Sequence, residues 1–309
     1  MIRPPRTHAA ARCRPRGRPL PPRLLVTVAL AIWTTAAGAM AAEIGGPVRL
    51  EYRFVAGETL DMEVSHRALT ETTVGSTAQA TETATDSRKR WRVLTVDDEG
   101  RATLEHSVDD VTMTSRTSDR GQVRWSSGDD EPPPPGYEQV KASLGVPLTR
   151  LVVDRSGRIL DRRDLRPCPP SSTGDLVVVP LPEEPVAEGA DWIVPQEVVV
   201  DLPGSLPKAV RTRLRYRLES IRDGIATISV DTTVLTPVDD PRLESRLIER
   251  IWDGTIEFDV DRGRVVRRTT GIDRRVVGFE GPESSVRYKA NLEERLVDRD
   301  DTRREAASR

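Results

Sequence analysis

Leu60-Asp61-Met62-Glu63-Val64 and Trp91-Arg92-Val93 alternate strictly between apolar and polar side chains. Successive side chains of a β-strand point to opposite faces, so this alternation is typical of antiparallel strands with one buried and one hydrated face. The pattern begins at Leu50–Phe54 and dominates the rest of the chain, whereas helical periodicity is confined to Tyr137–Leu144, which ends at the stop signal Gly145. The sequence therefore predicts a mainly β protein with one or two short helices.

The same series of strands and turns occurs twice along the chain. Gly57–Leu60 matches Gly189–Trp192, Trp91–Val96 matches Tyr216–Ile221, Gly100–Leu104 matches Gly224–Ile228, and Asp154–Ile159 matches Asp261–Val265. Two tandem, repeated, curved antiparallel sheets are expected, the first β repeat unit at residues 42–163 and the second at 186–297. A Pro-rich linker at 164–185 joins them, and a charged, disordered tail at 298–309 follows. Chance similarity between alternating strands is the alternative explanation.

The N-terminal 41 residues have the order of a secretory signal peptide. Seven arginines and no acidic residue precede the apolar run Leu24–Trp33, and small residues follow it up to Ala42. Ala39-Met40-Ala41 fits the cleavage rule, so residues 1–41 are predicted to be removed after Ala41, leaving an exported protein of the periplasm or cell envelope. The apolar run is half the roughly 20 residues of a membrane span, so the mature chain is expected to have no integral membrane span. An uncleaved anchor and a downstream start codon are the alternatives.

Charge and cysteine usage narrow the classes of partner. The chain has 47 basic and 49 acidic residues, and removal of the seven N-terminal arginines leaves 40 against 49, a net charge of −9. An acidic protein is a poor ligand for phosphate backbones, so nucleic acid is not expected as a partner. The mature chain keeps only Cys168, between prolines and without a nearby histidine, which forms no internal disulfide and is interpreted as an incidental loop thiol.

The ordered set of motifs resembles an uncharacterised family of exported bacterial β-sheet proteins, a domain of unknown function. Tyr52–Thr59 is similar to the opening of that family, and Trp91–Val93, Gly145, Pro182–Val186 and Trp192 follow in its order. The family has no established activity or site residues, so the resemblance implies export and a β-sheet fold and nothing about function. A curled sheet with a short helix is also distantly similar to lipoprotein-carrier half-barrels, at the level of fold alone.

No motif for catalysis, cofactor binding or metal binding is found. The mature chain has His66 and His106, and neither has a partner at zinc-type spacing. The acidic clusters Asp97–Gly100 and Asp239–Pro241 do not match a calcium loop and are interpreted as solvated turns. Carboxylate pairs that could hydrolyse a glycoside are not excluded, because the chain has many acids, but no pair is singled out. No catalytic residue, metal ligand or cofactor is therefore predicted.

Two runs of alternating arginines form the most distinctive polar feature. Arg88, Arg90 and Arg92 share one strand face, and the repeat places them on Arg213, Arg215 and Arg217, which Arg211 precedes. One interpretation is an anion-binding strip, because guanidinium groups suit carboxylates and phosphates. The other is ordinary cross-strand pairing with acids such as Glu105 and Asp231.

Three functional hypotheses remain open at this point. The first is a non-enzymatic ligand- or partner-binding module of the cell envelope, whose ligand would be an anionic small molecule, a lipid or an envelope polymer. The second is an envelope-polymer hydrolase that uses carboxylates, and the third is a purely structural envelope protein. Turnover of polysaccharides or esters would distinguish the second from the first.

Overall fold

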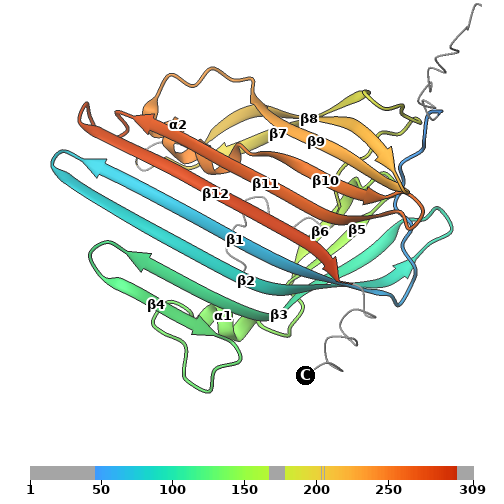
Figure 1. Ribbon diagram of the computed structural model, residues 1–309, viewed down its shortest axis with the longest axis horizontal. Helices are drawn as coiled ribbons and strands as arrows, with labels where there is room; N and C mark the ends of the chain where they lie inside the picture. Colours follow the sequence, from blue (N-terminus) through green and yellow to red (C-terminus); the bar gives the residue numbers. More distant parts are fainter. Residues whose placement is uncertain (1–45, 167–177, 203, 205, 298–309) are drawn as a thin grey trace, which may run out of the picture. The chain divides into compact units, whose positions relative to one another are not determined.

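The computed structural model describes residues 46–166, 178–202, 204 and 206–297. Twelve β-strands form one antiparallel sheet, together with two short α-helices and a 3-10 helix (Figure 1). The strands are β1 Thr59–Val74, β2 Thr77–Val96, β3 Ala102–Thr117, β4 Gly121–Ser126, β5 Thr149–Val153, β6 Ile159–Asp164, β7 Asp191–Val200, β8 Lys208–Arg222, β9 Ile225–Val234, β10 Asp253–Asp259, β11 Arg264–Val277 and β12 Ser284–Val297. The helices are α1 Glu138–Ser143, α2 Pro241–Leu247 and the 3-10 helix η1 Ile248–Arg250.

The mainly β fold with short helices is confirmed, but the structure has a single sheet where two tandem sheets were expected. The strand order is β6-β5-β3-β2-β1-β12-β11-β10-β9-β8-β7, and β4 pairs with β3 beside this path. Strand β1 of the first half pairs with β12 of the second half from Asp61↔Val297 to Val74↔Ser284. This long ladder satisfies the backbone groups of two strands that would otherwise be edges, and it merges the halves.

One apolar core serves both halves of the sheet. It contains Trp91 and Val93 of β2, Leu151 of β5, and Tyr216 and Leu218 of β8. Because β5 and β8 lie near opposite ends of the strand order, the sheet must curve to bring them into one cluster. We call the face that carries Trp91 and Tyr216 the inner face and the opposite one the outer face.

The chain before β1 and the chain before β7 fill the space inside the curve. Tyr52 is buried, and its hydroxyl accepts a hydrogen bond from the Val179 amide at 2.7 Å and donates to the Val179 carbonyl at 3.2 Å. The Trp192 indole donates to the carbonyl oxygen of Pro180 at 2.9 Å. Val178 and Val179, within the linker expected at 164–185, form a buried core segment outside any strand.

Of the two α-helices, one was predicted from the sequence and the other was not. Helix α1 lies within the expected Tyr137–Leu144, whereas α2 was not expected. Asp240, interpreted as part of a solvated turn, is the N-cap of α2, and its side chain accepts from the Arg242 amide at 2.9 Å. Leu243 and Leu247 anchor α2 in a small second core with Val200 and Val210.

The two halves place their strands in the same order. The neighbours β1-β2-β3-β5-β6 correspond in position to β7-β8-β9-β10-β11, and each half has its helix between the third and fourth of these strands. The matched glycines Gly100 and Gly224 both adopt positive φ, at 79° and 77°, in turns that follow β2 and β8. The duplication itself stays a prediction, which superposition of the halves would test.

Candidate functional site

The arginine runs named from the sequence lie on the outer face. In β8 the side chains of Leu214, Tyr216 and Leu218 are buried, whereas Arg215 and Arg217 are exposed. The period of two along the strand therefore separates an apolar inner face from a charged outer face.

Each arginine of the β2 run lies beside a carboxylate of a neighbouring strand. The pairs are Arg88–Glu63 at 3.7 Å, Arg90–Asp61 at 2.7 Å, Arg90–Asp109 at 2.8 Å and Arg92–Glu105 at 4.0 Å. The hydrogen bond that Arg90 Nε donates to Asp61 raises the pKa of Arg90, so this guanidinium stays charged. The β2 run is thus compensated by acids on both flanking strands.

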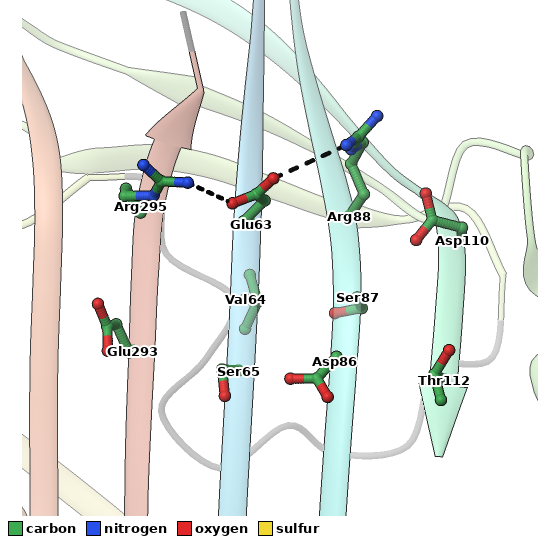
Figure 2. Close-up of a pocket in the computed structure, with 10 residues that line it drawn as sticks. All are labelled: Glu63, Val64, Ser65, Asp86, Ser87, Arg88, Asp110, Thr112, Glu293 and Arg295. Atoms are coloured by element: carbon green, nitrogen blue, oxygen red, sulfur yellow. Dashed lines mark hydrogen bonds and ion pairs between the residues drawn. The ribbon is translucent and has the colours of Figure 1, made fainter. Parts of the chain in front are cut away.

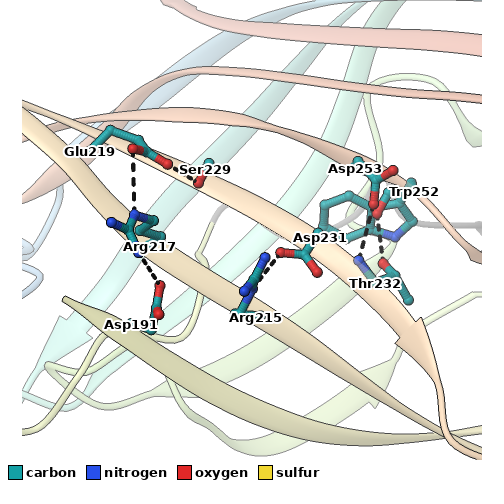
Figure 3. A network of polar contacts seen from close by, with 9 residues as sticks. All are labelled: Asp191, Arg215, Arg217, Glu219, Ser229, Asp231, Thr232, Trp252 and Asp253. Atoms are coloured by element: carbon teal, nitrogen blue, oxygen red, sulfur yellow. Dashed lines mark hydrogen bonds and ion pairs between the residues drawn. The ribbon is translucent and has the colours of Figure 1, made fainter. Parts of the chain in front are cut away.

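Two of the four arginines of the β8 run, Arg215 and Arg217, are compensated in the same way (Figure 3). Arg215 Nε donates to Asp231 Oδ2 at 2.8 Å, and Arg217 contacts Asp191 at 3.4 Å and Glu219 at 3.7 Å. These pairs are exposed, so water and salt screen their attraction. Glu105 and Asp231, the acids expected as cross-strand partners, do contact arginines of the two runs.

Arg211 and Arg213 differ from the rest of the run, because neither forms an ion pair within the described residues. Arg213 lies opposite Pro195 and Thr233 in the ladders, and its Nε is buried without a hydrogen-bond partner. Anion binding by the six predicted arginines remains a prediction, and among them only Arg213 forms no ion pair with a described acidic residue.

A shallow hollow of about 360 Å³ surrounds Arg88 on the outer face (Figure 2). Glu63 lies between two arginines, 2.7 Å from Arg295 and 3.7 Å from Arg88. Glu293, also at its rim, contacts Arg267 at 2.8 Å. No group of three or more His, Cys, Asp or Glu side chains that could hold a metal ion occurs in the part of the chain that the structure describes.

A second outer-face hollow, of about 440 Å³, has a different charge. We call it the basic depression, and it is lined by Arg67, Ala68, Leu69, Glu82, Thr83, Ala84, Thr114, Arg116, Gln122, Lys289, Ala290 and Asn291. Three cations and one carboxylate line it, so its lining carries an excess of positive charge. None of the arginines in the predicted strip belongs to it.

The sheet register explains how these residues meet. Lys289 of β12, Leu69 of β1, Glu82 of β2, Arg116 of β3 and Gln122 of β4 are successive ladder partners, forming one row across five strands. Four inter-strand spacings of about 4.8 Å make this row roughly 19 Å long. A second row, through Asn291, Arg67, Ala84 and Thr114, runs beside it.

Two of the three cations are available to a ligand. Arg67 is held by both carboxylate oxygens of Asp86 at 2.8 Å. Arg116 and Lys289 are exposed and make no ion pair within the described ranges. Asp273, the acid opposite Lys289 on β11, is instead bound by two nitrogens of Arg287 at 2.8 Å.

The inner face holds a buried ionic cluster next to the apolar core. Glu294 is hydrogen-bonded by Arg268, with Nε at 2.7 Å, and accepts from Lys89 at 3.3 Å. Glu294 is 5% exposed and Arg268 is 3% exposed. Charges at this depth persist only when they are paired, so the cluster is a structural element of the inner face.

The two histidines lie on the inner face near this cluster. His106 is buried, stacks on Trp91 with ring centroids 4.7 Å apart, and leaves its Nε2 without a partner. Burial lowers the pKa of His106 to about 3, and the charges of Lys89 and Arg162 add to the shift. The pKa of His66 is lowered too, mainly by burial and then by the charges of Arg67 and Lys89. Both rings are therefore neutral at pH 7.

Some predicted features fall outside the described residues. They are the predicted signal peptide and cleavage site at residues 1–41, the thiol of Cys168, and the charged tail at 298–309. In the ranges that are described, no helix has the length and apolar character needed to cross a bilayer.

Comparison with known proteins identifies no family. No protein-family model matches the chain, and no curated protein matches it. Among solved structures, the chain is similar to lipovitellin, in a structure of its lipid–protein interactions, with a TM-score of 0.46 and 13% identity. That match covers 80% of this chain and only 26% of the lipovitellin chain. DynF from the dynemicin biosynthesis pathway of Micromonospora chersina gives a TM-score of 0.23 and 6% identity, over 83% of this chain and 89% of DynF. Both scores are too low to carry a functional argument.

Proposed function

We propose that this chain is a non-enzymatic binding module, exported to the periplasm or cell envelope, whose basic depression binds an anionic polymer. The observation that supports this is the row from Lys289 to Gln122, in which two exposed cations that form no ion pair within the described residues flank Leu69 and Glu82 on a continuous sheet face. Elsewhere on the outer face most arginines of the predicted strip already contact carboxylates.

The side chains of the depression suit an acidic polymer with hydroxyl or amide groups. The guanidinium of Arg116 can bind a carboxylate or phosphate through two donors, and the Lys289 ammonium adds a second positive point. The side-chain amides of Gln122 and Asn291 both donate and accept hydrogen bonds, and Leu69 and Ala84 provide apolar surface between them.

An open site favours an extended ligand. Sites for small molecules are concave and cover most of the ligand surface, whereas Arg116, Gln122, Lys289 and Asn291 are all exposed on the sheet. A ligand lying across β12, β1, β2, β3 and β4 would contact both rows of side chains. A chain of repeated anionic units meets this requirement better than a single small anion.

Binding of defined polymers tests the proposal. Polygalacturonate and poly(glycerol phosphate) supply carboxylate and phosphate groups, and dextran is the neutral control. The double variant Arg116→Gln, Lys289→Gln should bind at least about tenfold more weakly, a loss of about 1.4 kcal/mol. Arg120→Gln is the matched control, because Arg120 lies in the β3–β4 turn, outside the depression. Equal binding by the double variant and the wild type would overturn the assignment of the site.

The same assay separates the other hypotheses. Loss of binding in Arg213→Gln, Arg215→Gln, with the depression variant unaffected, would move the site to the predicted arginine strip. Release of new chain ends from either polymer would indicate a hydrolase. Absence of binding to every polymer would favour a structural envelope protein.

A further inference from the structure

A third hollow lies on the inner face, between α2 and the sheet, and it is larger than the basic depression. Its volume is about 580 Å³, within the range of pockets that hold small molecules. We call it the α2 cavity, and it is lined by Thr72, Leu202, Asp240, Arg242, Ser245, Arg246, Glu249, Phe279, Glu280 and Val286. Leu243 and Leu247 bury the opposite side of α2, so this wall of the cavity is fixed by packing.

The apolar side chains around this cavity come from outside α2 and η1, where Thr72 and Glu280 accompany them. Leu202 follows β7, Phe279 belongs to the connection between β11 and β12, and Val286 lies on β12. By contrast, Arg242, Ser245 and Arg246 come from α2 and Glu249 comes from η1. The cavity thus has a charged side formed by α2 and η1 and a side that holds all of its apolar side chains, which suits an amphiphilic ligand.

The charged side carries both signs. Arg242 contacts Asp240 at 3.6 Å, and Arg246 forms no ion pair with any described residue. The carboxylates of Glu249 and Glu280 complete the lining. Burial raises the pKa of Tyr288 on β12, and the charge of Glu249 adds to this, so the Glu249 carboxylate lies near β12. A ligand with one sign of charge would be attracted by some of these groups and repelled by the others.

We propose that the α2 cavity binds a single-chain amphiphile with a zwitterionic head group, its phosphate on Arg242 and Arg246 and its ammonium on Glu249. The apolar chain would pack against Leu202, Phe279 and Val286, which removes apolar surface from water. This site is on the opposite face from the basic depression, so the proposal stands or falls separately from polymer binding.

Calorimetry on the full chain with a short-chain lysophosphatidylcholine, below its micelle concentration, tests the assignment. Lysophosphatidic acid keeps the phosphate and lacks the ammonium, an alkyltrimethylammonium has only the ammonium, and a monoacylglycerol has neither. The zwitterion should bind at least about tenfold more tightly than each of the other three. Equal affinity for all four ligands, or no binding of the zwitterion, would overturn the proposal.

Variants then assign the two ends of the head group. Arg246→Gln should reduce affinity for the zwitterion and for lysophosphatidic acid, and Glu249→Gln should reduce affinity for the zwitterion and for the alkyltrimethylammonium. Glu244→Gln is the matched control, because Glu244 is exposed on α2 and does not line the cavity. If Glu244→Gln lowers affinity as much as Glu249→Gln, binding reflects the general charge of the surface and the proposal is wrong.

Discussion

Replacing Glu294 by glutamine tests how strongly the inner-face ionic cluster stabilises the sheet. The variant removes the negative charge on which the Lys89 ammonium and the Arg268 guanidinium converge. Glu294 lies in β12 and Arg268 directly opposite in β11, next to the β1–β12 ladder that joins the halves. Because the cluster is buried, water cannot replace the lost interaction.

The magnitude follows from burial. Removing one partner of a buried ion pair costs about 3–5 kcal/mol, because a desolvated charge loses its compensation. For a domain of this size, each kcal/mol lowers Tm by about 2–4 °C, so Glu294→Gln should lower Tm by roughly 6–20 °C. The neighbouring residue provides the control, since Glu293 contacts Arg267 at 2.8 Å on the outer face, where both side chains are at least 40% exposed. Glu293→Gln should therefore cost no more than about 1 kcal/mol.

Urea unfolding of the two variants and the wild type, followed by tryptophan fluorescence at pH 7.5, measures both values. The midpoint of Glu294→Gln should fall with little change in the slope, which reports the surface exposed on unfolding. Equal costs for Glu293→Gln and Glu294→Gln, both below about 1 kcal/mol, would show that burial in this cluster has been overestimated and would refute the reasoning.

Three further predictions concern pH, one glycine and processing. His106 has a pKa of about 3 in the folded state against 6.5 when unfolded, so its contribution to stability is complete above pH 6.5 and is lost as pH falls. At pH 5 the loss should be about 2 kcal/mol, and His106→Gln should remove that part of the pH dependence in urea unfolding. If the stability of His106→Gln falls with pH as steeply as that of the wild type, the pH dependence belongs to other groups. Gly157→Ala would place a Cβ 2.5 Å from the Val179 carbonyl oxygen at φ +75°, whereas Gly57→Ala, at φ +84°, meets no atom within 4 Å. Gly57→Ala should cost about 1–2 kcal/mol from backbone strain alone, and Gly157→Ala should cost clearly more. Equal urea midpoints for the two variants would contradict the close approach of Val179. N-terminal sequencing of the exported protein should find a mature end between Met40 and Glu43, and an intact N-terminus on a membrane-bound protein would argue for an anchor.

The sequence predicts local properties of this fold well. Alternation in Leu60–Val64 and Trp91–Val93 identified real strands and their buried sides, because a period of two is fixed by strand geometry. The stop at Gly145 bounded α1 correctly. Helix α2 was not predicted, although Asp240 and Pro241 are N-terminal helix signals. Its two buried leucines contact strands that are distant in sequence, and a local pattern does not reveal such contacts.

Long-range pairing could not be predicted from the pattern. Nothing local specifies that β1 pairs with β12, because both are amphipathic strands that could pair with many others. The basic depression depends on this pairing, since Lys289 is more than 200 residues from Leu69. The alternating arginines were conspicuous in the sequence, yet their charges are largely met by acids on neighbouring strands, whereas the scattered Arg67, Arg116 and Lys289 form a site only in the folded sheet.

Lysine acetylation in the presence of polygalacturonate tests polymer binding by the basic depression most directly. Lys141, Lys208 and Lys289 are all exposed, and only Lys289 lies in the depression. If the polymer lies across β12 to β4, the modification rate of Lys289 measured by mass spectrometry should fall severalfold while the rates of Lys141 and Lys208 stay unchanged. An unchanged rate at Lys289 with polymer bound, or equal protection of all three lysines, would contradict the assignment.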